Sequence, residues 1–305
     1  MVLTVLSSCV SNPYLMQIQA PYTFSFLREQ DVPVLFDTFV AAFADYLIPI
    51  KISRKEFAMK FKREGVEASF CVGAFYGGQL VGFILTGLGE WQGKPTAYNS
   101  GTGVLPAHRG HQLTRQLYEF LLPKLRESGI EQCLLEVIDG NVAATKVYRS
   151  IGFEVTRALD CYRTPVEELL LSGQESDVEV KLAAKPNWKN YASFWDILPS
   201  WQNTIEAFRR SPDQKIVLEA FDGTQKVGYA ACFPRTGAVA QLAVHPDHRN
   251  QGIAKLLLKE IVKRSQAPAL LILNVDQTNA ALADFLGRIY LKRFLTQHEM
   301  LLRIQ

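Results

Sequence analysis

The sequence predicts an α/β protein, of the α+β type, made of two similar domains in tandem. Its 305 residues are more than one compact core usually holds, and they fit two domains of ordinary size. A hydrophobic fraction of 48% with 21% charged residues is typical of globular domains and argues against long disorder. One short segment also occurs in two similar copies, each within the same predicted order of strands and helices.

The first copy of this segment is Val104-Leu105-Pro106-Ala107-His108-Arg109-Gly110, and the second is Val244-His245-Pro246-Asp247-His248-Arg249-Asn250. Two strand-like runs joined by a glycine-containing turn precede each copy, which predicts a β-hairpin. These runs are Ser69–Tyr76 and Gln79–Leu88, then Ile216–Phe221 and Lys226–Phe233. Apolar residues at helical spacing follow each copy and predict an amphipathic helix, which Pro123 should kink or shorten in the first half.

The second part of each half also repeats. A buried strand is expected at Cys133–Ile138 and Leu270–Val275, then a helix that begins at Asn141 or Asn279. The final strands are predicted near Phe153–Tyr162 and Phe294–Leu302. Each domain should therefore be a mixed, mostly antiparallel sheet flanked by helices. We expect an N-terminal extension over 1–19, a first domain over 20–163, a linker over 164–177 and a second domain over 178–305.

Charge and hydropathy exclude several classes of protein. A formal net charge of +3 is too weak to indicate a nucleic-acid partner. The sequence has no apolar run near the ~18–20 residues that span a bilayer, which argues against a membrane protein. The five cysteines are scattered singly, which predicts reduced thiols and a cytoplasmic location.

One motif near the start favours a different location. Leu6-Ser7-Ser8-Cys9 resembles a lipoprotein cleavage site. The residues before it contain no Lys or Arg, and the apolar run is much shorter than the ~7–15 residues of a signal core. We therefore favour a loose extension before Met16 over a lipoprotein anchor.

The second copy of the repeated segment leads directly into a helix. The unpaired N–H groups and the dipole of a helix start favour an anion. Gly252 lets a ligand approach the backbone, and Arg249 adds a charged donor, so the loop suits a pyrophosphate. On the loop alone, we favour the simpler interpretation of a plain strand-to-helix turn with a surface arginine.

The loop resembles that of the GNAT N-acetyltransferase superfamily, which reads Arg/Gln-x-x-Gly-x-Gly/Ala after a Val-x-Pro strand end. The second copy, Arg249-Asn250-Gln251-Gly252-Ile253-Ala254, matches it completely. In the first copy, Gln112 and Thr114 replace the two small residues, so we expect weaker binding there. The resemblance implies two GNAT folds, acetyl-CoA as acyl donor, and transfer to a primary amine of a small molecule or peptide. It implies the following cofactor-binding residues: Val104, Arg109, Gly110, His111, Gln112, Leu113, Thr114, Asn141, Leu242, Val244, Arg249, Asn250, Gln251, Gly252, Ile253, Ala254 and Asn279.

A second element of the family lies in the first half, where Asn141 is followed by Tyr148 and then by Gly152-Phe153 at the family's spacing. The resemblance implies that Asn141 contacts the pantetheine arm and that Tyr148 protonates the departing CoA thiolate. The second half has Leu286 at the tyrosine position, and Tyr290 lies one turn further on. Our hypothesis therefore assigns catalysis to the first half, although a core aromatic is a common alternative for such a tyrosine.

Other features leave alternatives open. Glu90 and Glu136 are candidates for the base that accepts the amine proton, or else exposed strand charges. Four histidines lie in the two loops, but no carboxylate or cysteine stands near them at metal-ligand spacing, so we expect no metal. The aromatic segment Trp188–Trp201 is either a lid over an acceptor pocket or, as we favour, packing.

The sequence allows other functions besides catalysis. Since the loop motif and the tyrosine lie in different halves, the chain is alternatively a non-catalytic, regulatory acyl-CoA-binding protein, or its second domain only braces the first. The sequence identifies neither the amine acceptor nor the oligomeric state.

Overall fold

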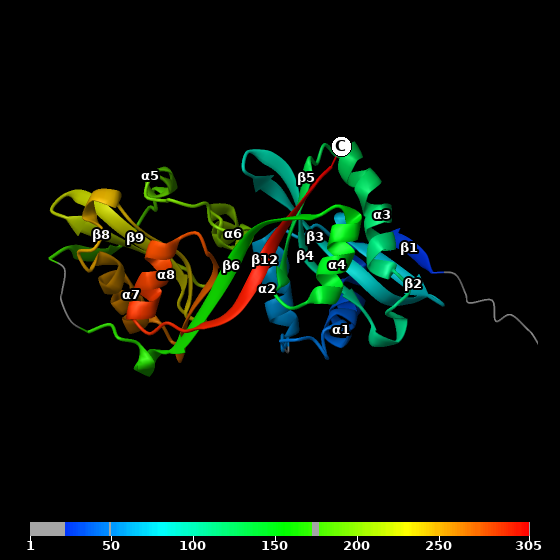
Figure 1. Cartoon of the computed structure of the whole chain (residues 1–305), viewed down its shortest axis with the longest axis horizontal. Helices are drawn as coiled ribbons and strands as arrows, with labels where there is room; N and C mark the ends of the chain where they lie inside the picture. The colour runs from blue at the N-terminus through cyan, green and yellow to red at the C-terminus, as the bar shows by residue number, and fades with distance from the viewer. Residues whose placement is uncertain (1–21, 49, 173–176, 305) are drawn as a thin grey trace, which may run out of the picture.

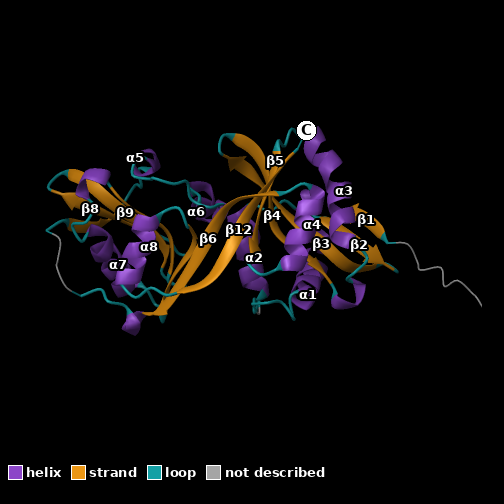
Figure 2. Cartoon of the chain, viewed as in Figure 1, coloured by secondary structure: helices purple, strands orange, loops and turns teal. Residues whose placement is uncertain are grey.

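The computed structural model describes residues 22–48, 50–172 and 177–304, so the predicted extension over 1–19, with Leu6 to Cys9, lies outside the described residues. The described chain forms one mixed sheet with helices on both faces (Figures 1 and 2). Along the sheet the strands follow the order β1-β2-β3-β4-β5-β12-β6-β11-β10-β9-β8-β7. The strands are β1 Thr23–Phe26, β2 Val72–Tyr76, β3 Gln79–Trp91, β4 Lys94–Val104, β5 Gln132–Ile138, β6 Glu154–Pro165, β7 Glu179–Leu182, β8 Ile216–Asp222, β9 Gln225–Phe233, β10 Ala238–Val244, β11 Ala269–Asp276 and β12 Arg293–Arg303. The helices are α1 Val32–Ala42, α2 Arg54–Glu64, α3 Leu113–Glu127, α4 Val142–Ile151, α5 Trp188–Ala192, α6 Ile205–Arg210, α7 Ile253–Arg264 and α8 Ala280–Arg288.

The helices divide between the two faces of the sheet in the same way in each half. In the first half, α3 and α4 bury Leu117, Leu121 and Tyr148 against one face, while α1 and α2 bury Phe39 and Phe57 against the other. In the second half, α7 and α8 pack on the first of these faces, and α5 and α6 pack on the opposite one. The predicted α/β architecture of two repeated units, with helices on both faces of the sheet, is confirmed.

The last strand of each half pairs with the other half. β12, at the end of the chain, lies antiparallel to β5 of the first half, from Gln297↔Ile138 to Arg303↔Gln132. β6 of the first half lies antiparallel to β11, for example Leu270↔Thr164. β6 and β12 pair with each other and cross the middle of the molecule as two long strands (Figure 1). Each half therefore needs a strand from the other to complete its sheet, although the sequence predicted a separate sheet for each.

The residue boundaries predicted for the two domains stay predictions, but the linker region is partly visible. β6 continues to Pro165, and residues 173–176 lie outside the described part. The helix α3 continues past Pro123 to Glu127, so the expected shortening at Pro123 does not occur.

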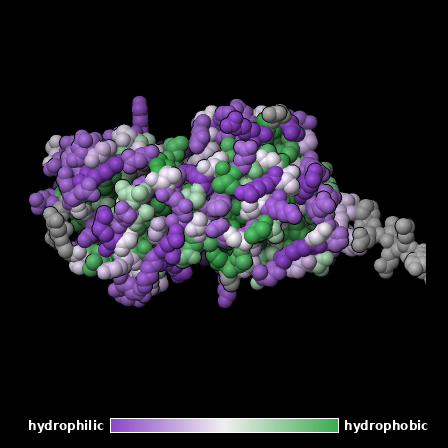
Figure 3. Space-filling view, viewed as in Figure 1, coloured by the Kyte–Doolittle hydropathy of each residue, from purple (hydrophilic) through white to green (hydrophobic). Residues whose placement is uncertain are grey.

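On the face shown in Figure 3, hydrophilic residues predominate and hydrophobic residues lie between them in smaller groups. Within the described ranges, the structure contains no helix with the length and apolarity that crossing a membrane requires.

Candidate active site

A cavity of about 670 Å³ opens in the second half, where β10 and β11 diverge. These two parallel strands share one residue pair, Ala238↔Leu271, and separate beyond it. The cavity is lined by both strands, by the start of α7, by α8 and by the segment Phe194–Pro199. A ligand that enters it lies between two strands and against a helix N-terminus.

The loop that leads into α7 has a special backbone. Asn250 and Gly252 both have positive φ, at 61° and 81°, and Gly252 caps the helix. In the first half, Gly110 and Gln112 have positive φ at the same two positions, and Gln112 caps α3. The left-handed region costs a non-glycine residue about 1–2 kcal/mol. In the first loop this residue is Gln112, and in the second loop it is Asn250. Both loops thus direct the free N–H groups of a helix start the same way.

The two loop arginines also make the same contacts. Arg249 Nε donates to Val244 O at 3.2 Å, Nη2 donates to Phe194 O at 3.2 Å, and Nη1 lies 2.9 Å from an Asp196 oxygen. Arg109 donates to Val104 O and Ala42 O and pairs with both oxygens of Asp45 at 2.6 and 2.7 Å.

Both guanidinium groups therefore hold a neighbouring segment in place. An anionic ligand at either loop would therefore meet the backbone N–H groups of the helix start.

The corresponding helix positions in the first half carry buried tyrosines. Tyr118 and Tyr148 lie in edge-to-face contact with each other and with Phe153, and both are buried. A void of about 10 Å³ lies beside Tyr118, between α3 and strands β3, β4 and β5. Burial raises the pKa of the Tyr148 hydroxyl. In the second half, Leu258 and Leu286 occupy the matching helix positions, and both are buried in the hydrophobic core.

The structure brings most of the predicted second-half residues together. The cavity lining includes Leu242, Val244, Arg249, Asn250, Gly252, Ile253, Ala254 and Asn279. Gln251 lies outside it and donates to Asp247 O. The predicted first-half residues do not line this cavity, and Asn141 is already engaged, since it caps α4 through Ala144 N and donates to Tyr46 Oη at 3.3 Å. The assignment of these residues, and of Tyr148 as the acid, stays a prediction.

Several polar residues of the cavity carried no recognisable sequence signal. Trp195 Nε1 donates to Tyr229 Oη at 2.6 Å, and Tyr229 Oη donates to Gln241 Oε1 at 2.8 Å. Gln241 in turn donates to Asn203 O at 2.6 Å. Asn274 lies in an irregularity of β11 with a positive φ of 57°, where strain often accompanies function.

The aromatic segment Trp188–Trp201 divides between packing and the cavity. Tyr191, Phe194 and Trp201 are buried in hydrophobic clusters, which is the packing alternative. The residues from Trp195 to Pro199 line the cavity, as a lid or pocket wall would. Tyr290, considered as a substitute acid, is 59% exposed and lies outside the cavity lining.

The loop histidines have partners other than a metal. His108 Nδ1 lies 3.0 Å from Tyr22 Oη, and His111 Nδ1 lies 3.0 Å from Arg109 O. Within residues 22–48, 50–172 and 177–304, no group of three or more His, Cys, Asp or Glu side chains lies together as a metal site requires. The absence of a metal stays a prediction.

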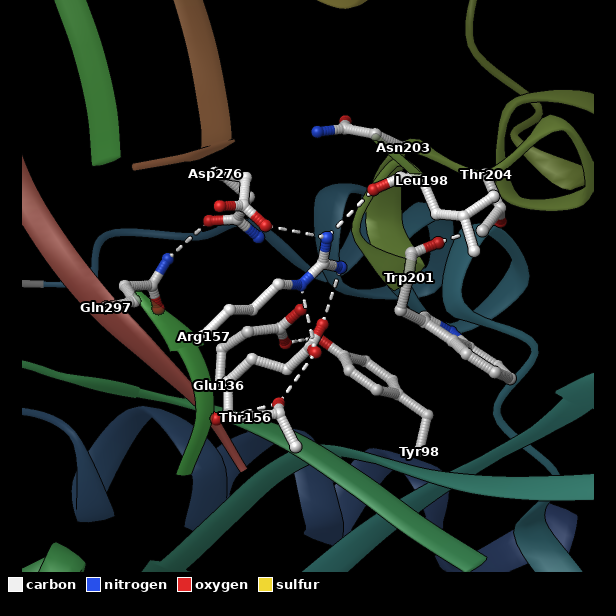
Figure 4. A network of polar contacts seen from close by, with 12 residues as sticks. Tyr98, Glu136, Thr156, Arg157, Leu198, Trp201, Asn203, Thr204, Asp276 and Gln297 are labelled. Atoms are coloured by element: carbon white, nitrogen blue, oxygen red, sulfur yellow. Dashed lines mark hydrogen bonds and ion pairs between the residues drawn. The ribbon is translucent and has the colours of Figure 1, made fainter. Parts of the chain in front are cut away.

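A buried polar network joins the two halves next to the cavity (Figure 4). Arg157 of β6 pairs with Glu299 of β12 at 2.7 Å and lies 3.4 Å from Asp276 of β11. Tyr98 of β4 donates to Glu136 of β5, which is directly opposite Glu299. Burial raises the pKa of Glu136 to about 8, so its carboxyl is largely neutral at pH 7. Glu136, a candidate base from sequence, lies outside the cavity lining.

Comparison with known proteins agrees with this geometry. The family model described as "Acetyltransferase (GNAT) family" matches residues 35–153 and 183–289. The sequence matches no curated protein.

Solved structures share the fold at low identity. A putative acetyltransferase from Pyrococcus horikoshii is 16% identical with a TM-score of 0.65, over 98% of this chain and 94% of that one. A tandem GNAT protein from the clavulanic acid biosynthesis pathway is 13% identical with a TM-score of 0.67, over 93% and 99%. The glucosamine N-acetyltransferase region of a fungal multi-domain β-N-acetylglucosaminidase is 15% identical with a TM-score of 0.72, and the 93% of this chain that aligns spans 38% of that longer protein.

Two family segments, two equivalent loops and a wedge-shaped opening between parallel strands together lead to one conclusion: the chain belongs to the acetyltransferase (GNAT) family, with two copies of its fold in tandem.

Proposed function

We propose that the protein is an N-acyltransferase that binds acetyl-CoA, or a related acyl-CoA, in the cavity between β10 and β11. It transfers the acyl group to a primary amine of a small molecule or peptide. The observation that supports this most is the cavity of about 670 Å³ with the N-terminus of α7 at its edge. Such a volume suits a cofactor-sized ligand, and the helix start suits its pyrophosphate.

The reaction needs few groups from the protein. The neutral amine attacks the thioester carbonyl, a C–N bond forms, the C–S bond breaks, and the amine proton leaves to solvent while the thiolate departs. A thiol has a pKa of about 8.5, so its thiolate is a tolerable leaving group near neutral pH without a proton donor. The site then contributes by holding both reactants in position, which is a large part of the rate in such transfers.

This proposal moves the reaction from the first half, as the sequence suggested, to the second. It gives Tyr148 a packing function, since that side chain is buried among Tyr118 and Phe153. As part of the same proposal we place the protein in the cytoplasm, because the four cysteines of the described residues are unpaired and buried.

A second candidate function is acyl-CoA binding without catalysis. It is favoured by Leu286, which stands where the family has its tyrosine, and by the exposure of Tyr290.

Two measurements on the full chain separate these functions. Calorimetric titration with acetyl-CoA tests binding, and thiol release from acetyl-CoA in the presence of polyamines, amino sugars, amino acids and short peptides tests transfer. The proposal expects binding together with amine-dependent thiol release. Binding without release on any amine supports the non-catalytic function, and no binding of acetyl-CoA or longer acyl-CoAs contradicts both.

A further inference from the structure

One wall of the cavity is a short segment that is attached at both ends by arginines. The wall is Phe194–Pro199, between α5 and α6, and all of its residues line the cavity. At its start, Arg249 of the phosphate-binding loop holds Phe194 O and Asp196. Near its end, Arg157 Nη1 donates to Leu198 O at 2.8 Å.

Arg157 comes from the first half of the chain, and its contacts fix it tightly. Its side chain is 13% exposed. Nε and Nη2 donate to the two oxygens of Glu299 at 3.0 and 2.7 Å, and the guanidinium lies over the ring of Trp91 at 5.2 Å. Thr156 Oγ1 donates to Glu299 Oε1 at 2.9 Å, so the partner carboxylate is itself held in position. A planar fork with this many fixed partners is a rigid anchor.

The same guanidinium reaches a second part of the cavity. Nη1 lies 3.4 Å from Asp276 Oδ2, at the end of β11, and Asp276 lines the cavity. Asp276 Oδ1 accepts from Thr278 N at 2.9 Å and from Thr278 Oγ1 at 2.7 Å, just before α8 begins at Ala280. Arg157 therefore connects the wall, the end of β11 and β12, which Figure 4 shows around its guanidinium.

The two arginines lie at different ends of the wall. Arg249 lies in the loop that we assign to the pyrophosphate, so its end of the wall borders the acyl-CoA. Leu198 lies at the far end from that loop, and its side chain is 47% exposed. The opening beside Leu198 is thus available to the second reactant.

We propose that Arg157 is a positioning residue for the amine acceptor: by holding Leu198 O and Asp276, it shapes the acceptor end of the cavity. The inference rests on the proposed function and deepens it. It assigns the first half a part in the reaction of the second, through one strand that crosses between them.

The test compares three variants of the full chain. Arg157→Lys keeps the charge but lacks the fork, and Arg157→Met removes both. The control is Arg210→Met, because Arg210 also joins the halves, through Arg63 O and Leu88 O, without touching the cavity lining. Each variant is measured for melting temperature, for acetyl-CoA affinity by calorimetry, and for KM toward the most rapidly acylated amine of the panel above.

We expect both Arg157 variants to raise the KM for the amine by roughly 10–100-fold, since a small misplacement of a reactant costs that much. Acetyl-CoA affinity should stay within about twofold of the wild type. Arg210→Met should lower the melting temperature and leave the amine KM unchanged. If Arg157→Met fails to fold, Arg157→Lys decides alone.

Three results would overturn the proposal while leaving the proposed function intact. The first is an unchanged amine KM in the Arg157 variants. The second is a loss of acetyl-CoA affinity as large as the rise in amine KM. The third is the same rise in amine KM in Arg210→Met. A wild-type chain that acylates no amine overturns the proposed function, and this inference with it.

Discussion

The loops after β4 and β10 follow the same backbone path, but the interiors behind them differ. Both have positive φ at matching positions, and both hold their arginine against a strand end and an aspartate. Behind the first loop, Tyr118 and Tyr148 are packed against Phe153, whereas behind the second loop a cavity of about 670 Å³ lies between β10 and β11. The comparison teaches that a binding loop alone does not identify a site, because the side chains behind it decide whether a ligand fits.

The largest effect is expected from filling the second loop. Gly252→Trp should abolish acetyl-CoA binding, because a bulky side chain at φ 81° strains the loop and occupies the edge of the cavity. Calorimetry on the full chain measures this. The matched change in the first half, Gln112→Trp, should leave the affinity unchanged, and equal losses in both variants would contradict the difference between the halves.

A second comparison concerns the strands that flank the centre of the sheet. Glu136 is third from the end of β5, and Asn274 is third from the end of β11, so a carboxyl and an amide occupy matching places. The folded-state pKa of Glu136, raised to about 8 by burial, exceeds its usual 4.5. Between pH 4.5 and pH 8, the protein therefore takes up a proton at Glu136 when it folds. The contribution of Glu136 to the free energy of unfolding is fully present below pH 4.5 and is lost as the pH rises toward 8.

Glu136→Gln should remove this loss, because an amide still accepts the hydrogen bond from Tyr98 and never ionises. Between pH 5 and pH 8 the free energy of unfolding of the wild type should fall by roughly 4 kcal/mol more than that of the variant, at about 1.4 kcal/mol per pKa unit. Urea unfolding at both pH values measures the difference. Parallel pH profiles for the two proteins would show that Glu136 is ionised in the folded state.

The smallest effect is expected at the tyrosine that the sequence favoured. If the reaction takes place in the second half, Tyr148→Phe should change turnover by less than about twofold, since the hydroxyl lies in a packed core. A proton donor at this position would instead cost ~10²–10⁴-fold in turnover. Steady-state kinetics with acetyl-CoA and an accepted amine distinguish the two, and the larger loss would return catalysis to the first half.

The features that the sequence predicted correctly depend on residues that lie close together in the chain. The repeated Val-x-Pro loops, the hairpins around Gly77 and Gly223, and the helices after each loop all follow from turn residues and apolar spacing. These features predicted the family and the fold, and they predicted most of the second-half residues that line the cavity.

The remaining features depend on distant contacts. Nothing local in Arg249 indicates that its guanidinium pairs with Asp196, and nothing in Tyr148 distinguishes a proton donor from a core side chain. The pairing of β5 with β12 joins residues more than 150 positions apart in the sequence, which spacing and periodicity do not encode.

That pairing has a consequence for how the protein is made. The N-terminal half leaves the ribosome first. The edge of β5 then lacks its neighbouring strand β12 until Arg293–Arg303 has been synthesised. During this interval β5 has unpaired backbone groups that attract strands of other molecules, as exposed sheet edges do. The nascent first half therefore stays unfinished until β12 has been made, and a chain cut short before β12 leaves both halves without a complete sheet.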